Sequence, residues 1–351
     1  MSKRILFIGG SLNQTTMMHQ IARQLPEHEA WFTPFYTDGK LEPLVDRGWA
    51  DFSIMGGRMR AATERYLADQ GLKVDYKGRR GRYDLALLGT DLLVPNNLAD
   101  TKVVLVQEGM TDPEDLMYNL VKWLKLPRLL ASTATTGLSH QYDRFCVASE
   151  GYREHSAAKG VDPDKIVVTG IPNFDNCAQY LENDFPHKHY VLVCTSDTRE
   201  TWAYENRKRT ILNAVRIADG RQLVFKLHPN ENVRRATAEI NRWAPGALIF
   251  PTGKTEEMIA NCDVLVTRFS TTVYIGLALG KEVYSEFDVG ELRSMTPLQN
   301  GSAAKNIAAV CRTLLEDGVA PVTGQKAGRR RPLRWRAKRF QTSHSEALEE
   351  R

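Results

Sequence analysis

The stretch DVLVTRFSTTVYIGLALGKEVYS, residues 263–285, contains the parts of one strand–helix–strand unit. Residues 263–267 are mostly apolar, as in a buried strand, and hydroxyl side chains follow at 270–272, where a helical pattern begins. After Gly280, the run 282–285 predicts another short strand. Strands joined in this way by a helix lie parallel in one sheet, so the stretch predicts an α/β protein.

The same alternation of short apolar runs and longer amphipathic stretches continues through the rest of the chain. The run 3–8 predicts a first strand, closed by two glycines, and a helix is expected from about Thr15 to Leu25. A last amphipathic helix is expected at Ser302–Asp317. The other expected strands are Tyr83–Leu88, Lys102–Val106, Arg144–Ala148, Lys165–Thr169, Tyr190–Cys194, Gln222–Lys226 and Ala247–Phe250.

The length of the chain, 351 residues, predicts two domains, each large enough to bury its own core. The segment QYLENDFPHKH, residues 179–189, is polar and contains a proline, so we expect a linker there. The domains would then be residues 1–178 and 190–318, followed by a basic, flexible tail at 319–351. In doubly wound sheets ligands bind at the carboxyl ends of the strands, so we expect a ligand in a cleft between the two domains.

The surplus positive charge lies near the C-terminal end of the sequence. The chain has 47 Lys and Arg against 42 Asp and Glu, a net charge of +5. Residues 326–351 hold nine of the basic and three of the acidic residues, so the other 325 residues have a net charge of −1. A near-neutral body without an RNA-binding motif argues against nucleic acid as the partner.

Five scattered cysteines predict free, buried thiols in a reducing compartment, because no spacing suits a disulfide framework or structural zinc. His and Asp residues do not stand at metal-ligand spacing either, so we expect no metal. The apolar run at 5–8 is too short for a signal peptide, and no apolar stretch approaches the ~20 residues that span a bilayer. We therefore expect a cytoplasmic protein.

The hydroxyl cluster Ser270, Thr271 and Thr272 is the first of three candidate sites at strand ends. Hydroxyls and free backbone N–H groups at the start of a helix suit a phosphate group. An ordinary Ser or Thr cap explains the same pattern.

The second candidate is His228, which Pro229 follows directly after an expected strand. Such a histidine can donate a hydrogen bond to a phosphate oxygen, and Lys226 adds positive charge. A histidine that packs in a loop or core is the alternative.

The third candidate is Glu108, at the end of the expected strand 102–106. A carboxylate there could act as a general base if burial raises its pKa, or it could cap a helix or form an ion pair. The loop Gly9-Gly10-Ser11, with Gln14 close behind, fits neither a dinucleotide-binding fingerprint nor a P-loop. It is either a ligand-facing loop or a simple tight turn.

The second half of the chain resembles the nucleotide-binding domain of glycosyltransferases with the GT-B fold, above all those of the bacterial capsule and teichoic-acid group. That group includes CDP-glycerol glycerophosphotransferases, polysialyltransferases and Kdo capsule transferases. Its members carry a His-Pro motif and, later in the sequence, a pair of hydroxyl residues, both around the phosphates of the donor. In this chain His228-Pro229 and Ser270-Thr271-Thr272 follow in the same order. The likeness covers roughly 165–290 well and 1–160 only loosely.

Two further motifs support the resemblance. The run VLVCTSDTRE, residues 191–200, is similar to the motif that opens the donor domain of the glycerophosphotransferases, and it adds Thr195 and Arg199 to the expected site. The run VTGIPNFD, residues 168–175, resembles a Thr-Gly-x-Pro-x-x-Asp segment shared with UDP-GlcNAc 2-epimerases, and it adds Gly170.

The resemblance implies two Rossmann-like domains that face a cleft, with the acceptor on the 1–178 side and the donor on the 190–318 side. It implies a nucleotide sugar as substrate, a glycan or lipid-linked acceptor, and neither metal nor cofactor. Glu108 would remove the proton of the acceptor hydroxyl, and His228 would stabilise the departing phosphate. The loop Gly9, Gly10, Ser11 and Gln14 would face the acceptor. The implied donor-binding residues are Lys226, Pro229, Arg268, Ser270, Thr271, Thr272, Thr195, Arg199 and Gly170.

The sequence departs from these families at two positions. Glycerophosphotransferases have His where this chain has Glu108, and the sialyl- and Kdo-transferases have an acidic pair where it has Gln107-Glu108. This difference favours sugar transfer with a carboxylate base. Arg268 replaces an Asp of the family pattern, and it can bind either a phosphate or a neighbouring carboxylate.

Three other functions stay open on the sequence. They are a non-hydrolysing UDP-GlcNAc 2-epimerase, a CDP-glycerol-type phosphotransferase and a non-catalytic scaffold that binds a nucleotide sugar. The basic segment 326–340 contains Leu333, Trp335 and Phe340 among its arginines, which suits the surface of an anionic membrane. A solvated tail is the alternative. If the segment binds a membrane, the protein would be attached peripherally to the inner face of that membrane.

Overall fold

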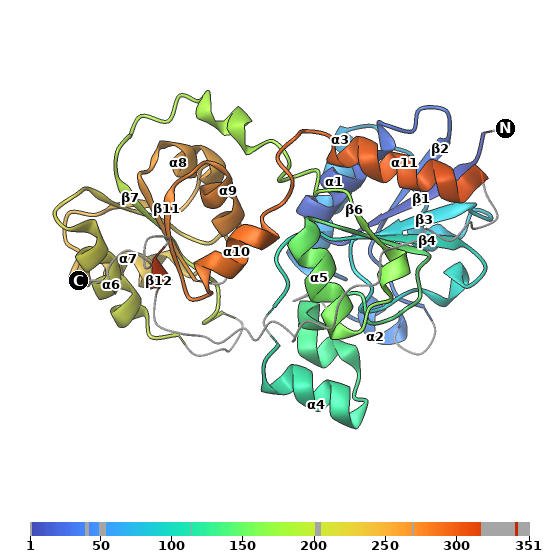
Figure 1. The fold of residues 1–351 in the computed structure, drawn as a ribbon, viewed down its shortest axis with the longest axis horizontal. Coiled ribbons are helices and arrows are strands. Elements are labelled where there is room, and N and C mark those ends of the chain that lie inside the picture. The colour runs from blue at the N-terminus through green and yellow to red at the C-terminus, as the bar shows by residue number, and fades with distance from the viewer. Residues whose placement is uncertain are drawn as a thin grey trace. The chain divides into compact units, whose positions relative to one another are not determined.

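The computed structural model describes residues 2–38, 42–48, 54–112, 114–200, 205–268, 270–316 and 341–342. The chain divides into two compact units (Figure 1). Unit 1 comprises the described residues of Met1–Asp175 and Pro297–Arg334, and unit 2 those of Asn176–Thr296 and Trp335–Arg351.

The sheet of unit 1 has the strand order β2-β1-β3-β4-β5-β6, with every pair parallel. Apolar runs buried on both faces are typical of parallel strands, and residues 5–8 of the first strand are at most 1% exposed. The strands are β1 (Arg4–Gly9), β2 (Glu29–Pro34), β3 (Leu85–Leu88), β4 (Lys102–Val106), β5 (Arg144–Val147) and β6 (Ile166–Val168). The helices are α1 (Leu12–Ala22), α2 (Glu42–Asp46), α3 (Gly57–Asp69), α4 (Leu116–Leu124), α5 (Glu150–Lys159) and α11 (Ala303–Glu316), with a 3-10 helix η4 (Arg128–Thr135).

The sheet of unit 2 has the order β12-β11-β10-β7-β8-β9. All its pairs are parallel except that of β12 with β11, which is antiparallel. Its core brings Val193, Phe225 and Val266 of three neighbouring strands against Ile211 and Ile240 of two helices. The strands are β7 (Val191–Cys194), β8 (Leu223–Lys226), β9 (Leu248–Phe250), β10 (Val264–Thr267), β11 (Glu282–Ser285) and β12 (Gln341–Thr342). The helices are α6 (Arg207–Ala218), α7 (Val233–Trp243), α8 (Thr255–Asn261), α9 (Thr272–Ala278) and α10 (Val289–Met295).

The predicted α/β fold is confirmed, and each expected strand lies within two residues of an observed one. The first helix begins earlier than expected, at Leu12 rather than about Thr15, because Ser11 Oγ accepts a hydrogen bond from the backbone N–H of Gln14 and caps it. The sequence did not reveal β2, since it is a partly polar strand at the edge of the sheet that ends in a proline.

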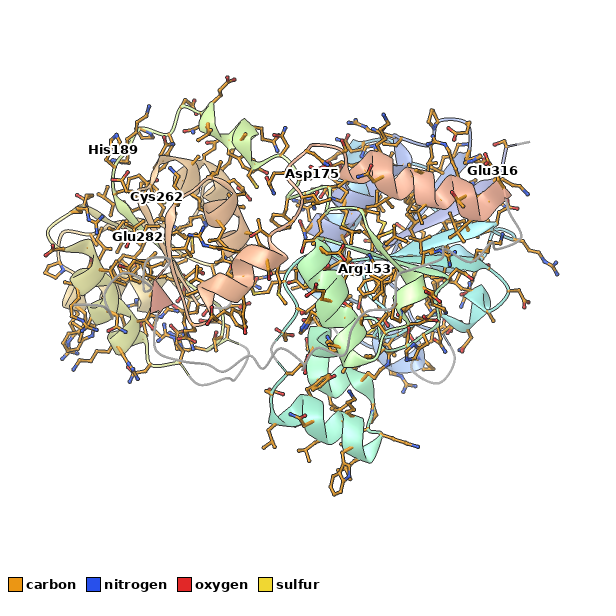
Figure 2. The ribbon with its side chains drawn as sticks, in the orientation of Figure 1. Arg153, Asp175, His189, Cys262, Glu282 and Glu316 are labelled. Atoms are coloured by element: carbon orange, nitrogen blue, oxygen red, sulfur yellow. The ribbon has the colours of Figure 1, made fainter. Side chains whose placement is uncertain are left out.

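Helix α11 packs on α1 and belongs to unit 1, whereas the sequence prediction placed it in the second domain, residues 190–318. The backbone N–H of Ala303 donates to Asp175 Oδ2 at 2.8 Å, at the start of the helix (Figure 2), and Arg312 pairs with Glu27 at 2.6 Å. The amphipathic pattern showed that this helix has one buried face. It could not show which sheet that face covers.

The predicted linker 179–189 belongs to unit 2 and packs there. Asn261 Nδ2 donates to Asn183 Oδ1 at 2.6 Å, and the ring of Phe185 contacts those of Tyr190 and Phe250. A polar segment that contains one aromatic anchor is therefore part of the fold. The predicted tail at 319–351, with its membrane-binding segment 326–340, lies outside the described residues except for 341–342.

The five cysteines are buried, and none of them forms a disulfide bond. Burial raises the pKa of the thiols of Cys146 and Cys194 to about 12, so both are protonated at neutral pH. Among the helices of the described residues, none combines the length and the apolar character needed to cross a bilayer.

Candidate functional site

Each sheet has one point where the chain reverses the direction in which it adds strands. In unit 1 this point lies between β1 and β3, and in unit 2 between β7 and β10. Ligands of open α/β sheets bind beside the carboxyl ends of the strands at such a switch point. The loops that follow β1, β3 and β4, and those that follow β7, β8 and β10, are therefore the candidate surfaces.

The glycine loop after β1 is packed closely around Gln14. A Cβ added to Gly10 would lie 2.8 Å from the side chain of Ile54, and one added to Gly89 would lie 2.9 Å from Gln14 Cδ. Gly89 follows Leu88, which pairs with Ile8 across β1 and β3, so the two glycine segments are neighbours. The Gly10 N–H donates to Gln14 Oε1 at 2.7 Å, and this fixes which end of the Gln14 amide points outward.

Glu108 lies just beyond β4, and its half-buried carboxylate accepts three hydrogen bonds from the loop after β1. The donors are Ser11 Oγ at 2.9 Å, Asn13 Nδ2 at 3.1 Å and Gln14 Nε2 at 2.6 Å. Among the described residues no cation forms an ion pair with this carboxylate. The structure thus brings together Glu108, Ser11 and Gln14, which the sequence singled out as base and acceptor loop.

A second layer of side chains orients these donors. Asn173 Nδ2 donates to Asn13 Oδ1 at 2.6 Å, which leaves the amide nitrogen of Asn13 for Glu108. Gln20 Nε2 in turn donates to Asn173 Oδ1 at 2.7 Å. The sequence analysis missed Asn13 and Asn173, and the polar run after Gly10 and the Pro-Asn pair at 172–173 were the available signals.

Gln107 has a different role from its neighbour. Its Oε1 accepts from the backbone N–H of Ala148 at 2.9 Å, and its Nε2 donates to the carbonyl of Gly109 at 2.8 Å. Gln107 is 2% exposed and ties the end of β4 to the segment after β5. Its amide is therefore committed to the backbone.

In unit 2, register places the ends of β10, β7 and β8 side by side, since Thr267 pairs with Cys194 and Cys194 with Lys226. Thr195 then links the loops. Its Oγ donates to Glu231 Oε2 at 2.5 Å and accepts from the backbone N–H of His228 at 3.0 Å.

The ring of His228 is oriented by its own loop. Its Nδ1 accepts a hydrogen bond from the backbone N–H of Asn230 at 3.2 Å, with Asp197 Oδ2 at 3.6 Å. Since Nδ1 accepts, the neutral ring carries its proton on Nε2. With 36% of the side chain exposed, Nε2 is a donor available to a ligand. The adjacent Pro229 is exposed at the turn.

The hydroxyl cluster forms a cap at the start of α9. Ser270 Oγ accepts from Thr272 Oγ1 at 2.9 Å and from the Thr272 backbone N–H at 3.3 Å. Thr271 is the residue that precedes the helix. All three are partly exposed. Ser270 Oγ thus accepts from one backbone N–H of the first turn, whereas the side chain of Thr271, the N-cap residue, makes no capping hydrogen bond.

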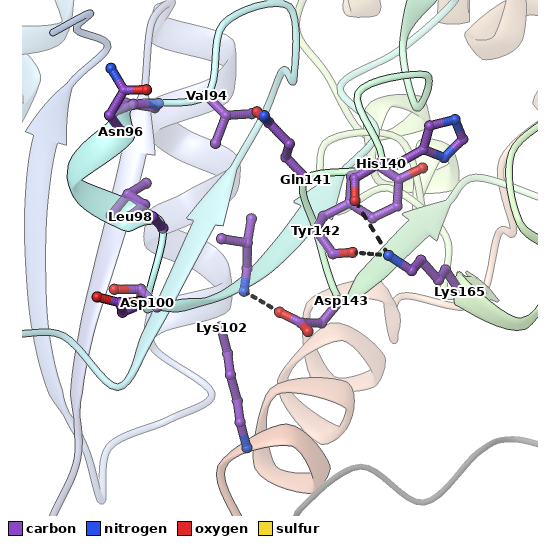
Figure 3. A pocket seen from close by; sticks show the side chains of 14 residues that line it. Val94, Asn96, Leu98, Asp100, Lys102, His140, Gln141, Tyr142, Asp143 and Lys165 are labelled. Carbon is purple, nitrogen blue, oxygen red and sulfur yellow. Dashed lines mark hydrogen bonds between the residues drawn. The ribbon is translucent and has the colours of Figure 1, made fainter. Parts of the chain in front are cut away.

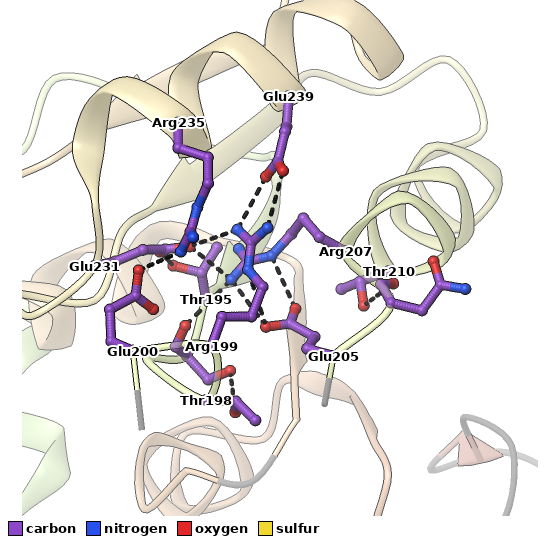
Figure 4. A network of polar contacts seen from close by, with 12 residues as sticks. Thr195, Thr198, Arg199, Glu200, Glu205, Arg207, Thr210, Glu231, Arg235 and Glu239 are labelled. Carbon is purple, nitrogen blue, oxygen red and sulfur yellow. Dashed lines mark hydrogen bonds and ion pairs between the residues drawn. The ribbon is translucent and has the colours of Figure 1, made fainter. Parts of the chain in front are cut away.

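Both arginines expected at the site are held by carboxylates, and Figure 4 shows this for Arg199. Arg199 forms a bidentate pair with Glu239, with both N···O distances at 2.9 Å. Arg268 forms a bidentate pair with Glu286, at 2.7 and 3.0 Å. The sequence left open whether Arg268 binds a phosphate or a carboxylate, and in the structure it binds the carboxylate.

Behind these pairs lies a buried core of charges that the sequence analysis missed. Arg207, which is 4% exposed, contacts Glu205 at 2.8 Å and Glu231 at 2.6 Å. Glu231 also lies 3.5 Å from Arg199, and Glu205 lies 3.7 Å from Arg268. These residues join into one network across the carboxyl edge of the sheet. Glu231, Glu239 and Arg268 are distant in the sequence from Arg199, Glu205 and Arg207, so no local pattern points to their contacts.

Two other residues that were expected to bind the sugar donor, Lys226 and Gly170, are not among the exposed groups at this edge of the sheet. Lys226 is buried, its Nζ donates to the carbonyl of Leu227 at 2.8 Å, and burial lowers its pKa. Gly170 belongs to unit 1, after β6, where its φ of 83° favours glycine. A Cβ there would lie 3.0 Å from Ala303 Cβ, so the glycine also permits close packing of α11.

A pocket of about 570 Å³ opens at the opposite edge of the sheet of unit 1, by the amino ends of β4 and β5 (Figure 3). Its polar groups have partners within the protein. Asp143 Oδ2 accepts from the Val103 N–H at 2.7 Å, and Lys165 Nζ donates to the Tyr142 carbonyl at 2.7 Å. We therefore place the candidate site at the carboxyl edges. In the part of the chain that the structure describes, no group of three His, Cys, Asp or Glu side chains is placed to hold a metal ion.

No protein-family model and no curated protein sequence matches the chain. Solved structures match it over 90% of its length. It is similar to UDP-GlcNAc 2-epimerase from Neisseria meningitidis bound to UDP-GlcNAc, with 14% identity, 100% of that chain covered and a TM-score of 0.55. It is also similar to S. aureus MnaA in complex with UDP, with 13% identity, 97% of that chain covered and a TM-score of 0.55. The wall teichoic acid polymerase TagF matches with 11% identity, 89% of that chain covered and a TM-score of 0.51.

At these identities the comparisons establish the fold. The chain is an α/β protein of the GT-B type, built from two Rossmann-like units.

Proposed function

We propose that the chain is a glycosyltransferase that moves a sugar from a nucleotide-activated donor to a hydroxyl of a glycan or lipid-linked acceptor. The observation that carries the proposal is the carboxylate of Glu108, held at the end of β4 by three neutral donors. A carboxylate that is fixed in position and free of an ion pair can accept a proton from an acceptor hydroxyl.

In the proposed reaction the acceptor oxygen forms a bond to the anomeric carbon of the sugar, and the bond from that carbon to the donor phosphate breaks. Glu108 takes the proton of the acceptor hydroxyl. Negative charge develops on the departing phosphate, and the Nε2–H of His228 donates a hydrogen bond to it. Ser270, Thr271 and Thr272 add further donors, which matter most as the charge grows.

Arg199 and Arg268 have an indirect part in this proposal. Each guanidinium is held by a glutamate in a bidentate pair, so a diphosphate would have to compete with that carboxylate. We infer that they shape the loops around the donor, as do Thr195 and the buried Lys226. This leaves His228 and the hydroxyl cluster as the proposed direct contacts.

The fold similarity supports a nucleotide sugar as the substrate class, since two similar structures are complexes with UDP and with UDP-GlcNAc. We place the reaction in bacterial surface polysaccharide synthesis, with TagF as a similar structure from that area of metabolism. The buried free thiols suit the cytoplasm, where we propose the enzyme acts, at the inner face of the membrane.

A non-hydrolysing UDP-GlcNAc 2-epimerase is the second candidate. The TM-scores of 0.55 with the UDP-GlcNAc 2-epimerase from Neisseria meningitidis and with S. aureus MnaA favour it. A CDP-glycerol-type phosphotransferase is less well supported, because the chain has Glu108 where those enzymes have a histidine. A scaffold that only binds a nucleotide sugar would require neither Glu108 nor an acceptor.

A two-step experiment tests the proposal. Thermal shifts with CMP, CDP, UDP and GDP identify the nucleotide, because a ligand bound only by the native state raises its apparent stability. The matching nucleotide sugar is then incubated with and without acceptor glycans. We expect nucleotide release that requires acceptor or is strongly stimulated by it.

The outcomes separate the candidates. Conversion of UDP-GlcNAc to its 2-epimer without an acceptor would establish the epimerase. Transfer of glycerol phosphate from CDP-glycerol would establish the phosphotransferase. Binding without any turnover would leave the scaffold, and no thermal shift with any of the nucleotides would overturn the proposed donor class.

A further inference from the structure

Helix α4 of unit 1 is apolar on both of its faces. Its inner face packs through Tyr118 and Val121 against Ala131 and Ala134 of η4. The outer face of a surface helix is usually polar, yet here it is apolar as well. Figure 1 shows α4 standing out from the sheet of its own unit. The exposed apolar residues of α4, of the turn after it and of the start of η4 are Leu116, Met117, Trp123, Leu124, Leu126, Leu129 and Leu130. Trp123 is 79% exposed. We call these seven residues the α4 patch.

The α4 patch is a concentration rather than a random scatter. Fourteen large apolar side chains are exposed among the described residues, and the patch supplies seven of them from 15 consecutive positions. Single exposed apolar residues are normal on a soluble protein, whereas a contiguous group marks a surface that binds something.

The charge of the same segment is positive. Residues 116–130, LMYNLVKWLKLPRLL, contain three basic residues and no Asp or Glu. Arg128 pairs with the buried Asp91 at 3.1 Å, and Lys122 Nζ donates to the Lys159 carbonyl at 3.1 Å. Lys125 is exposed at the end of α4, and within the described ranges no carboxylate pairs with it. The exposed Lys122 and Lys125 therefore lie in the C-terminal half and at the end of α4, beside Trp123 and Leu124, whereas the acidic residues of this region precede its first residue.

We propose that the α4 patch binds the surface of an anionic phospholipid membrane. A tryptophan and several leucines beside lysines are the composition of segments that lie in the interface of a bilayer, with the rings at the level of the headgroups and the lysines on the phosphates. Protein interfaces are depleted in lysine, whereas two exposed lysines lie beside Trp123 and Leu124 here. This surface is distinct from the basic segment 326–340, and the proposal does not depend on the proposed reaction.

A probe on the patch gives a direct test in the full chain. The five native cysteines are buried, so Leu124→Cys offers an accessible thiol for an environment-sensitive fluorophore. We expect its emission to rise and shift to shorter wavelength with vesicles that mix phosphatidylglycerol and phosphatidylcholine, and to change little with phosphatidylcholine alone. Leu212→Cys, on an exposed position of α6, is the matched control and should stay unchanged.

Sedimentation with the same vesicles measures the energy of the contact. We expect Trp123→Ser/Leu124→Ser to weaken binding about tenfold or more, and Lys122→Glu/Lys125→Glu to weaken it on anionic vesicles. The control pair Leu181→Ser/Leu212→Ser, two exposed leucines elsewhere, should bind like the unmodified chain.

The possible results are distinct. A silent probe at position 124 together with vesicle binding would place the contact elsewhere, for example in 326–340, and would overturn the proposal. A dimer that Trp123→Ser/Leu124→Ser dissociates, without any vesicle binding, would assign the patch to a second copy of the chain and would overturn it too. Because the probe reports on a folded chain with one exposed substitution, a misfolded double variant does not affect the test.

Discussion

The carboxyl edges of the two sheets carry opposite kinds of polar site, although the two units share one architecture. In unit 1 a single carboxylate, Glu108, is held by neutral donors. In unit 2 arginines and glutamates form a network in which each guanidinium faces a carboxylate (Figure 4). The comparison separates charges that can act on a ligand from charges that hold the protein together.

The units also differ in how they bury ionisable groups. Unit 2 buries Arg207 by pairing it with Glu205 and Glu231. Unit 1 buries His155 and Lys159 of α5, and burial lowers the pKa of His155 to about 3 and that of Lys159 to about 8. Arg207 is thus buried among charged partners, whereas burial favours the neutral forms of His155 and Lys159.

Replacement of Glu108 tests the proposed catalytic role of the carboxylate in unit 1, and it should have the largest effect on turnover. Gln at this position keeps the shape and accepts no proton, so we expect turnover with the true donor and acceptor to fall about a hundred- to ten-thousandfold. The melting temperature should change little. Steady-state kinetics of Glu108→Gln, beside the control Glu150→Gln on an exposed glutamate, measure this. Near-normal turnover would remove Glu108 from the mechanism.

Replacement of Arg207 tests whether the charge network of unit 2 stabilises the folded protein. Arg207→Met removes the nearest cation from the buried Glu205 and Glu231 and leaves only the longer contacts with Arg199 and Arg268, so we expect the free energy of unfolding to fall by about 3–5 kcal/mol. Urea denaturation measures it. Arg235→Met is the control, because Arg235 pairs with Glu200 at a half-exposed position, where the loss should be about 0–1 kcal/mol.

The double variant Arg207→Met/Glu231→Gln sharpens this prediction. If the two residues share one interaction, its destabilisation should be smaller than the sum of the two single effects by about 0.5–3 kcal/mol. Strict additivity would mean that the buried pair contributes no coupling.

Acidification tests the difference in buried groups. Since the pKa of His155 is lowered to about 3, the unfolded chain binds a proton below pH 6.5 that the folded chain does not. The folded state should therefore lose about 2 kcal/mol through this residue by pH 5. Urea denaturation at a series of pH values should show a shallower loss for His155→Gln, while the exposed control His140→Gln should follow the unmodified chain. Parallel curves for all three proteins would show that His155 does not cause the loss of stability in acid. The loss would then come from other groups, such as the nearby Glu114 and Lys159.

Gln14 tests how far the neutral donors matter to Glu108. Gln14→Met removes one of the three hydrogen bonds and the contact with the Gly10 N–H. We expect kcat to fall about tenfold or less, with KM nearly unchanged, which corresponds to about 1 kcal/mol. Gln70→Met at an exposed position is the control. An unchanged kcat would show that Ser11 and Asn13 suffice to hold the carboxylate.

Much of the candidate site in unit 1 was visible in the sequence. Glu108, Ser11 and Gln14 stand directly after predicted strands, and the ends of parallel strands meet at one edge, so their approach follows from the topology. Asn13 and Asn173 were missed because an amide in a polar loop gives no local signal of its partner. Glu231 is likewise brought to Glu205 and Arg207 only when β7 and β8 pair, so no local pattern points to that contact.

The sequence by itself determined the α/β fold, the positions of most strands and the residues at their carboxyl ends, because apolar periodicity and turn chemistry are local properties. The tertiary structure alone decided that α11 belongs to unit 1, that Arg199 and Arg268 are held by glutamates, and that large apolar side chains of α4 are exposed. Each of these depends on which distant residues come within a few ångströms. An amphipathic helix or a lone arginine is compatible with several partners, and only the packed chain selects one.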